Sequence, residues 1–365
     1  MLIRDILEES EKKFSEIKAV KWLKKKEICD RSYRELMENA KSVRKGLCEE
    51  SFQGKHIALI GSSSVEWIEA YLGIITGQAV AVPLDAGLPV EDLIDLLNRS
   101  DAEALFLSPK IQTLSERILE ECPKLKKIWI LQEENIETNQ KKVASVAELM
   151  TSGINGTDDF AAPDPEDIAT IIFTSGTTGK SKGVMLTGNN LAGNVTFGIR
   201  TELLKKGDKV LSFLPLAHAY GCAFDFLTAT AVGTHVTLLG KVPSPKILMK
   251  AFEEVKPNLI ITVPLVIEKI YKNVIQPTIN KRTMRWALSI PLLDGQIYGQ
   301  IRKKLVDALG GRFKEIIIGG AAMNPEVEEF FHRIKFPFTI GYGMTECAPL
   351  ISYAPWNEFV PTSSG

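Results

Sequence analysis

The chain has 365 residues, more than a single hydrophobic core normally spans, so we expect two or more core-forming units. Hydrophobic residues make up 45% of the sequence and charged residues 24%, as in ordinary folded proteins rather than disordered ones. The 44 basic and 45 acidic side chains leave a formal net charge of −1, which excludes a global positive field that would recruit nucleic acid.

The cysteines and the chain start indicate a cytoplasmic protein. Five widely spaced cysteines form no CxxC pair, which argues against a disulfide framework or structural zinc and favours a reducing compartment. Charge from Arg4 onward rules out a secretory signal, and no apolar run approaches the length of a membrane span. The basic run 21–26 is a solvated edge or a peripheral membrane contact.

Hydrophobic periodicity predicts alternating helices and strands in the first part of the chain. Apolar residues recur at three- and four-residue spacing over 33–49, which indicates an amphipathic helix. Further on, the pattern predicts strands at 56–60, 79–84 and 104–107 and helices at 65–75 and 90–98. Such alternation is typical of a parallel sheet that helices cover on both faces. The polar stretch 133–165 is interpreted as a surface connection.

A second α/β unit is expected after residue 166. The pattern predicts strands at 168–173, 183–187, 209–214, 235–239, 258–263, 315–318 and 336–340. The predicted domains are therefore 1–165, with an N-terminal helical segment, and 166–365. The last residues, Pro361–Gly365, provide neither a helix cap nor a closing strand, so we expect a longer protein with a further C-terminal part.

The densest motif lies between two strand-like runs and predicts a phosphate-binding loop. Its glycines admit close backbone approach, its hydroxyls donate hydrogen bonds, and its two lysines supply positive charge. The motif consists of Thr174, Ser175, Gly176, Thr177, Thr178, Gly179, Lys180, Ser181, Lys182 and Gly183. A Walker A loop would need glycine at position 174 and a helix directly after it. A plain hairpin turn would not need two lysines.

Three further segments carry polar or small residues beside predicted strands. Gly341, Tyr342, Gly343, Met344, Thr345 and Glu346 combine a flat ring, a hydroxyl and a carboxylate, which suits a nucleotide with Mg²⁺. Gly320, Ala321 and Ala322 follow a predicted buried strand and leave a slot, although tight strand–helix packing would also explain them. His218, Tyr220 and Gly221 lie in a loop before an apolar helical stretch, and a lone histidine is more often structural.

Together, TSGTTGKSKGV, GYGMTE and the glycine-alanine segment resemble the adenylate-forming (AMP-binding) superfamily. The segments PLAHAYGCAFDFL, KPNLIITVPLVIEKIY and GYGMTECAPLISY narrow the likeness to bacterial long-chain fatty acid–CoA ligases. Ser181 departs from the proline usual there, which changes loop stiffness more than chemistry. The resemblance implies two doubly covered sheets in αβαβα layers, an incomplete β-barrel subdomain and a missing C-terminal lid.

The resemblance also implies roles for individual residues. Tyr342 would pack on adenine, with Gly320, Ala321, Ala322, Gly341 and Gly343 beside it. Thr345 would contact the α-phosphate, and Thr174 and Glu346 would hold Mg²⁺. The catalytic residues would be Thr345, Glu346, Lys182 and His218. His218, Tyr220, Gly221 and Met344 would position the acyl group. His218 is assigned to substrate positioning rather than to general base catalysis.

The implied reaction joins a long-chain fatty acid to ATP, releases pyrophosphate and transfers the acyl group to coenzyme A. Positioning and charge neutralisation would drive it without a protein nucleophile. Two alternatives remain. One is adenylation of an aryl acid or delivery to a carrier protein, and the other is a nucleotide-binding module without catalysis.

Overall fold

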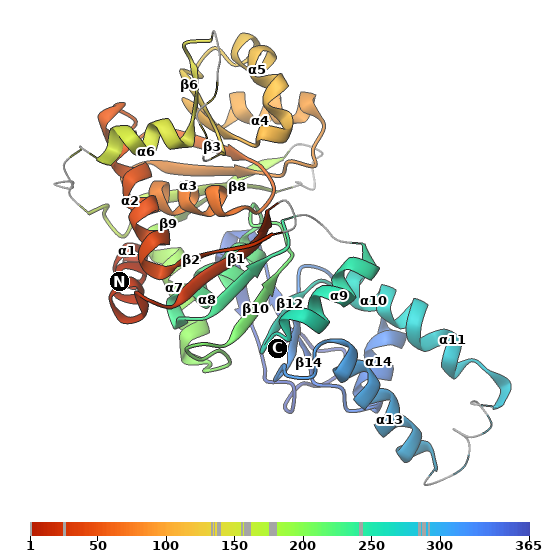
Figure 1. The fold of residues 1–365 in the computed structure, drawn as a ribbon. Helices are drawn as coiled ribbons and strands as arrows, with labels where there is room; N and C mark the ends of the chain where they lie inside the picture. Colours follow the sequence, from red (N-terminus) through yellow and green to blue (C-terminus); the bar gives the residue numbers. More distant parts are fainter. Residues whose placement is uncertain are drawn as a thin grey trace.

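A computed structural model describes residues 2–24, 27–132, 134, 136, 140–154, 156, 162–174, 181–240, 244–283, 286, 290 and 293–365. Its strands form two main bodies of sheet, each covered by helices, as Figure 1 shows. The predicted mixed α/β fold with doubly covered sheets is confirmed, and the strands of the described residues close no barrel. In the same described part, no helix combines the length and the apolar composition that a membrane span requires.

The first sheet has seven strands in the order β7-β6-β5-β3-β4-β8-β9. All neighbours pair in parallel except β8 and β9, which are antiparallel. The strands are β3 (His56–Ile60), β4 (Val80–Leu84), β5 (Ala104–Leu107), β6 (Lys127–Ile130), β7 (Val143–Ser145), β8 (Ile168–Thr174) and β9 (Lys182–Thr187).

Successive residues of this sheet face two different hydrophobic cores, as the two-residue period of a strand requires. Ile57 and Leu59 belong to the core beneath α2, α3 and α6, whereas Ala58 and Ile60 belong to the core beneath α4 and α5. The helices are α2 (Tyr33–Glu49), α3 (Val65–Ile75), α4 (Val90–Arg99), the 3₁₀ helix η1 (Pro109–Leu114), α5 (Ser115–Glu121) and α6 (Val146–Ile154). Helices therefore cover both faces.

The second body of sheet consists of four strands in the order β10-β11-β1-β2 and three in the order β12-β13-β14. A parallel bridge between Val210 and Leu259 connects the two groups. The strands are β1 (Lys18–Lys24), β2 (Glu27–Ser32), β10 (Lys209–Ser212), β11 (His235–Leu238), β12 (Ile260–Thr262), β13 (Ile316–Ile318) and β14 (Phe338–Ile340). Except for the hairpin of β1 and β2, these strands pair in parallel.

The remaining elements surround the second sheet and its strand ends. Several start with caps that the sequence provides, for example Asn324 before Pro325. The helices are α1 (Ile3–Phe14), α7 (Gly188–Arg200), the π-helix η2 (Gly221–Thr228), α8 (Ala229–Val232), α9 (Pro245–Val255), α10 (Pro264–Ile270), the π-helix η3 (Tyr271–Ile275), α11 (Gln276–Ile279), α13 (Leu293–Ala308) and α14 (Pro325–Arg333). A small ribbon follows, made of β15 (Tyr342–Gly343), the 3₁₀ helix η4 (Thr345–Cys347) and β16 (Leu350–Ser352).

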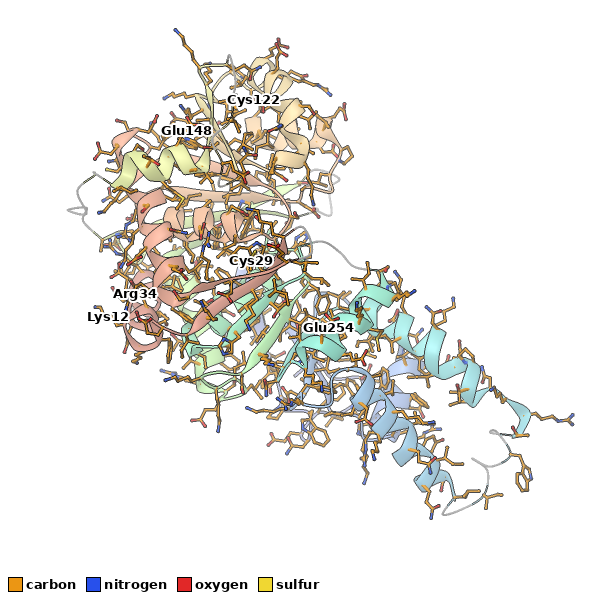
Figure 2. All side chains as sticks on the ribbon, in the orientation of Figure 1. Lys12, Cys29, Arg34, Cys122, Glu148 and Glu254 are labelled. Carbon is orange, nitrogen blue, oxygen red and sulfur yellow. The ribbon has the colours of Figure 1, made fainter. Side chains whose placement is uncertain are left out.

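Two parts of the sequence differ from the simple alternation that was predicted. The stretch 133–165 is not only a connection, because its apolar residues form the buried strand β7 and the helix α6. Strand pairing also crosses residue 166, since β8 and β9 join the first sheet while β1 and β2 join the second. The division into domains at residue 166 stays a prediction. All five cysteines are free, and Figure 2 places Cys29 and Cys122 in separate parts of the chain.

Candidate functional site

A cavity of about 360 Å³ lies where strands of the second sheet end. The carboxyl ends of β10, β12, β13 and β14 all lead into segments that line it. In open α/β sheets, ligands bind outside the carboxyl ends of parallel strands, because loops from several strands meet there. The lining residues are Leu214, Pro215, His218–Gly221, Val263, Gly319, Gly320, Gly341–Thr345, Pro349 and Leu350.

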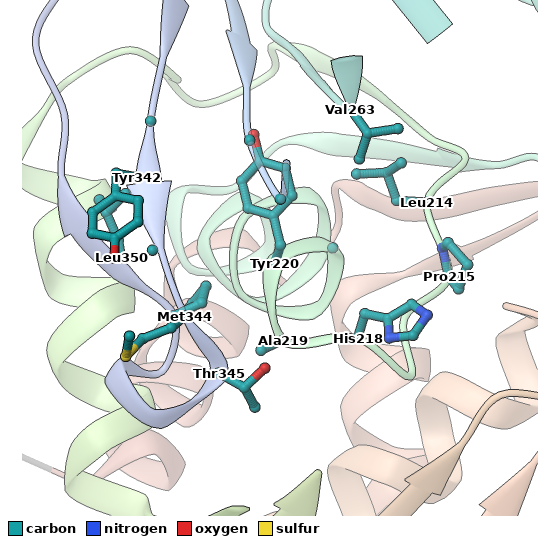
Figure 3. A pocket seen from close by; sticks show the side chains of 16 residues that line it. Leu214, Pro215, His218, Ala219, Tyr220, Val263, Tyr342, Met344, Thr345 and Leu350 are labelled. Atoms are coloured by element: carbon teal, nitrogen blue, oxygen red, sulfur yellow. The ribbon is translucent and has the colours of Figure 1, made fainter. Parts of the chain in front are cut away.

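This cavity brings together residues from three of the predicted motifs. His218, Tyr220 and Gly221 follow β10, Gly320 follows β13, and the segment Gly341–Thr345 follows β14. Figure 3 shows the Tyr220 ring in the middle of this group, with Tyr342 and Leu350 on one side and Leu214 and Val263 on the other. The roles assigned to these residues stay predictions.

The loop after β10 connects the cavity to the first sheet. The backbone N–H of Leu216 donates to the Ser63 hydroxyl at 3.2 Å. His218 has a side chain that is 56% exposed, and its Nε2 lies 3.5 Å from Oδ2 of Asp85, the residue directly after β4. His218 therefore lies at the junction of the two sheets. Sequence reasoning missed Asp85, although its position at the carboxyl end of a buried parallel strand was a usable signal.

Tyr220 separates the main cavity from a smaller apolar one. Its hydroxyl donates to the backbone carbonyl of Ile317 at 3.0 Å. A β-carbon at Gly319 would lie 3.1 Å from the Tyr220 ring, so glycine at that position leaves room for the ring. Behind the ring lies an apolar cavity of about 40 Å³, which Phe224 and Tyr353 also line.

The ribbon that carries Thr345 and Glu346 is held in a fixed shape. A β-carbon at Gly343 would lie 2.2 Å from the Pro349 carbonyl oxygen, so only glycine fits there. The Asn194 side chain on α7 donates to the Cys347 carbonyl at 3.0 Å and accepts from the Leu350 N–H at 3.0 Å. Asn194 was also missed, because nothing in its local sequence shows which distant loop it contacts.

The predicted phosphate loop lies outside the described residues between positions 175 and 180, so Ser175, Gly176, Thr177, Thr178, Gly179 and Lys180 have no structural account. Its two ends are described: Thr174 ends β8 and pairs with Lys182, which begins β9. The 3₁₀ helix η4 contacts β9, which brings the segment with Glu346 next to the strand that leaves the loop. Lys182 and Glu346 are both exposed.

The donor set near these loop ends fits Mg²⁺. The ion takes one or two carboxylates together with phosphate and water oxygens rather than a cage of protein ligands. Glu346 offers one carboxylate and Thr174 one hydroxyl, both of them hard oxygen ligands.

The glycine–alanine segment borders a second cavity of about 460 Å³ next to the first. Gly320, which has φ +86°, and residues Gly341–Gly343 line both cavities. Ala321 and Ala322 line only the second one, together with Thr362–Ser364. The structure thus places Tyr342, Gly320, Ala321 and Ala322 around the second cavity. His218 and Thr345 line only the main cavity.

Two layered sheets with loops of this composition at their strand ends agree with the adenylate-forming fold that the motifs resemble. Residues 7–365 match the family of AMP-binding enzymes. The chain belongs to that family, which confirms the resemblance inferred from its motifs.

Its curated relatives include long-chain acyl-CoA synthetases. The chain is 24% identical to long chain acyl-CoA synthetase 8 of Arabidopsis thaliana over 362 residues, which is 90% of this chain and 50% of the relative. It is 29% identical to the peroxisomal long chain acyl-CoA synthetase 7 of the same plant, covering 82% and 45%. Long-chain-fatty-acid–CoA ligase 3 of Saccharomyces cerevisiae is 26% identical, covering 86% and 51%. The chain thus spans about half the length of these relatives.

Solved structures confirm the fold. The anthranilate CoA ligase AuaEII in complex with anthranoyl-AMP matches with a TM-score of 0.79 at 18% identity, covering 100% of this chain and 64% of that one. The ATP-bound MatB of Rhodopseudomonas palustris matches with a TM-score of 0.75 at 19% identity, again covering 100% and 64%. The A-PCP didomain of a carboxylic acid reductase from Segniliparus rugosus, in complex with AMP, has a TM-score of 0.78 at 19% identity, covering 96% and 54%.

Proposed function

We propose that the protein activates a long-chain fatty acid with ATP, forms an acyl adenylate with release of pyrophosphate, and transfers the acyl group to coenzyme A in the cytoplasm. The main support is that the His218–Gly221, Gly319–Gly320 and Gly341–Thr345 segments line one cavity at the strand ends. The long-chain acid is suggested by the names of the curated relatives.

The residues of the cavity and of the neighbouring loop ends each have a task in this proposal. Tyr342 offers a flat face to the adenine, and the glycines on both sides of it leave space for the base. Thr345, Lys182 and the phosphate loop bind the phosphates, and Thr174 with Glu346 would hold Mg²⁺, which neutralises charge on the departing pyrophosphate. His218 and Met344 bind the carboxyl end of the acid, with the Asp85 carboxylate orienting the imidazole.

An exchange assay tests the reaction class. The full-length protein should exchange labelled pyrophosphate into ATP only with a long-chain acid and Mg²⁺, and should then form a thioester with coenzyme A. This chain alone should bind Mg·ATP weakly and show less than about a tenth of that turnover. The resemblance implies that a C-terminal lid supplies a lysine to the developing charge, and losing such a cation typically reduces the rate by about 10²- to 10³-fold. Turnover of this chain within about tenfold of that of the full-length protein would contradict the proposal that the C-terminal lid contributes to catalysis.

The same assay separates the alternatives. Preference for benzoate-type acids, or for a phosphopantetheinyl carrier protein over coenzyme A, would point to the other adenylating activities. Binding of Mg·ATP without exchange by the full-length protein, for every acid tested, would identify a nucleotide-binding module instead.

Tyr220 is expected to set the chain-length preference. The apolar cavity behind it holds a few water molecules at most, so an alkyl chain fits only if this ring moves or is removed. Tyr220→Ala should raise kcat/KM for palmitate relative to octanoate by about tenfold, the usual scale of discrimination in an apolar pocket. Tyr220→Phe, which keeps the ring and loses only the bond to Ile317, serves as the matched control. An unchanged ratio in Tyr220→Ala would place the acyl chain elsewhere.

A further inference from the structure

A helical arm projects from the second sheet, away from the cavity-lining strands. It consists of α10, η3, α11 and α13 and is visible at the lower right of Figure 1. Aromatic contacts attach its base, since the Tyr271 and Tyr298 rings lie 5.2 Å and 6.4 Å from the Phe330 ring of α14. Beyond this base, many of its side chains extend into open space (Figure 2). We call residues 264–309 the basic arm.

The charge of the basic arm differs from that of the rest of the chain. It contains eight Lys and Arg residues against three Asp and Glu residues, whereas the whole chain has 44 and 45. Two of the three acids are engaged by backbone groups: Glu268 accepts from the Asn324 N–H at 2.8 Å, and Asp294 accepts from the Gly295 N–H at 2.7 Å. Eight basic side chains against three acidic ones leave the arm with an excess of five positive charges.

The basic side chains that the structure describes in the arm are all exposed, and none forms an ion pair with another described residue. They are Lys269, Lys272, Lys281, Arg282, Arg302, Lys303 and Lys304. Basic side chains on the helices of the first sheet can be paired, since Arg117 on α5 forms ion pairs with both Glu91 and Glu121. Unpaired cations gathered in one place favour an anionic partner.

The helix α13 presents its charges away from the protein. Tyr298, Ile301 and Leu305 recur at three- and four-residue spacing and pack toward the core. Lys303 therefore lies on the opposite face, Arg302 and Lys304 lie on its two flanks, and all three side chains are exposed. Their cationic ends are free to meet a surface.

Apolar side chains are exposed within the same basic arm. Leu265 is 58% exposed and lies on the outer side of α10, one turn before Lys269. Trp286 is 69% exposed. A nucleic acid strand could use the cations and stack a base on Trp286, but it has no use for an exposed aliphatic side chain such as Leu265. A lipid interface binds basic residues at its headgroups and both Leu and Trp at its acyl boundary.

We propose that the basic arm docks the protein on anionic lipid surfaces. The cations contact the headgroups, and Leu265 and Trp286 enter the interfacial layer. This docking is independent of the proposed catalysis, because it needs neither nucleotide nor acid.

Sedimentation with vesicles tests the docking. The chain should bind phosphatidylcholine vesicles that contain about a quarter phosphatidylserine and leave pure phosphatidylcholine vesicles unbound, with binding lost at high salt. The combined variant Arg302→Glu, Lys303→Glu, Lys304→Glu should weaken binding by about a hundredfold or more, given the usual contribution of each basic residue near such a surface. Leu265→Ser should weaken it less and leave the salt dependence intact.

The matched control applies the same charge change elsewhere. Lys110, Lys141 and Lys142 are exposed and lie on the first-sheet side, in η1 and just before β7, and their combined replacement by Glu should leave binding within about twofold. Circular dichroism would verify that each variant folds. Equal loss in the control, equal binding to both vesicle types, or tighter binding to single-stranded RNA than to the charged vesicles would each overturn the proposal.

Discussion

Replacing Glu346 by alanine should reduce acyl-adenylate formation by the full-length protein by about a hundredfold or more, a typical effect of losing charge stabilisation at a reacting phosphate. Glu346 lies on η4, which contacts the strand leading out of the predicted phosphate loop. It is the acidic residue of the GYGMTE segment, and Asn194 fixes the backbone around it. Without the Glu346 carboxylate, Mg²⁺ would lose its negatively charged protein ligand.

Pyrophosphate exchange at saturating acid measures this effect, and a titration of Mg²⁺ separates metal binding from other defects. Glu346→Gln keeps the size of the side chain and should fail similarly, with a higher Mg²⁺ requirement. The control Glu253→Ala removes an exposed carboxylate from α9 and should leave exchange unchanged. Exchange close to normal in Glu346→Ala would remove this residue from the metal site.

The second large effect concerns Asp225, a carboxyl group that the proposed reaction does not use. Asp225 lies in the π-helix η2 with no exposed surface, and neither of its carboxyl oxygens has a hydrogen-bond partner of standard geometry among the described residues. Burial raises the pKa of this group well above its usual range. The backbone N–H of Leu214, which approaches without standard hydrogen-bond geometry, offsets only part of that rise.

A raised pKa makes the folded state less stable as pH increases. Below the ordinary pKa of 3.8, both folded and unfolded states hold the proton, so the group's contribution to stability is fully present. Above it, only the folded state keeps the proton, and the free energy of unfolding falls by about 1.4 kcal/mol per pH unit until the folded pKa is reached. Asp225→Asn has no such proton, so its stability relative to the native chain should rise across this window.

Urea unfolding of the native chain and of Asp225→Asn between about pH 4 and pH 8 measures the difference in their free energies of unfolding. The contributions of other titrating groups cancel in this difference. Asp92→Asn, at an exposed position on α4, should show no comparable trend. A difference between Asp225→Asn and the native chain that stays constant with pH would show that Asp225 is not protonated in the folded state.

The hydrophobic pattern of the sequence predicted those helices and strands that contacts between neighbouring residues determine. The helix expected at 33–49 is α2, which begins at a capping box formed by Ser32 and Glu35, and the strand at 56–60 is β3. The hairpin of β1 and β2 was not predicted, because its burial does not alternate and β1 pairs with the distant β11. The π-helix η2 was expected only as an apolar helical stretch, since its wider turn leaves no distinct sequence period.

In the candidate site, too, the features that depend on local sequence were predictable, and those that depend on distant contacts were not. Segments rich in glycine and hydroxyl residues could be recognised from sequence, and the structure places three of the four around one cavity. Contacts made by Asp85 with His218, or by Asn194 with the 347–350 backbone, depend on how distant strands and helices pack. No local pattern in the sequence carries that information.

The Asn194 contacts also determine which parts of the site move as one body. Helix α7 starts at Gly188, directly after β9, so a short continuous stretch of chain connects Lys182 to Asn194. Asn194 in turn holds the ribbon with Glu346, although that ribbon follows a strand of the other sheet. If the angle between the two sheets changes during a catalytic cycle, Lys182 and Glu346 would travel together and keep their spacing. Asp85, which follows a strand of the first sheet, would then shift relative to His218, which follows a strand of the second.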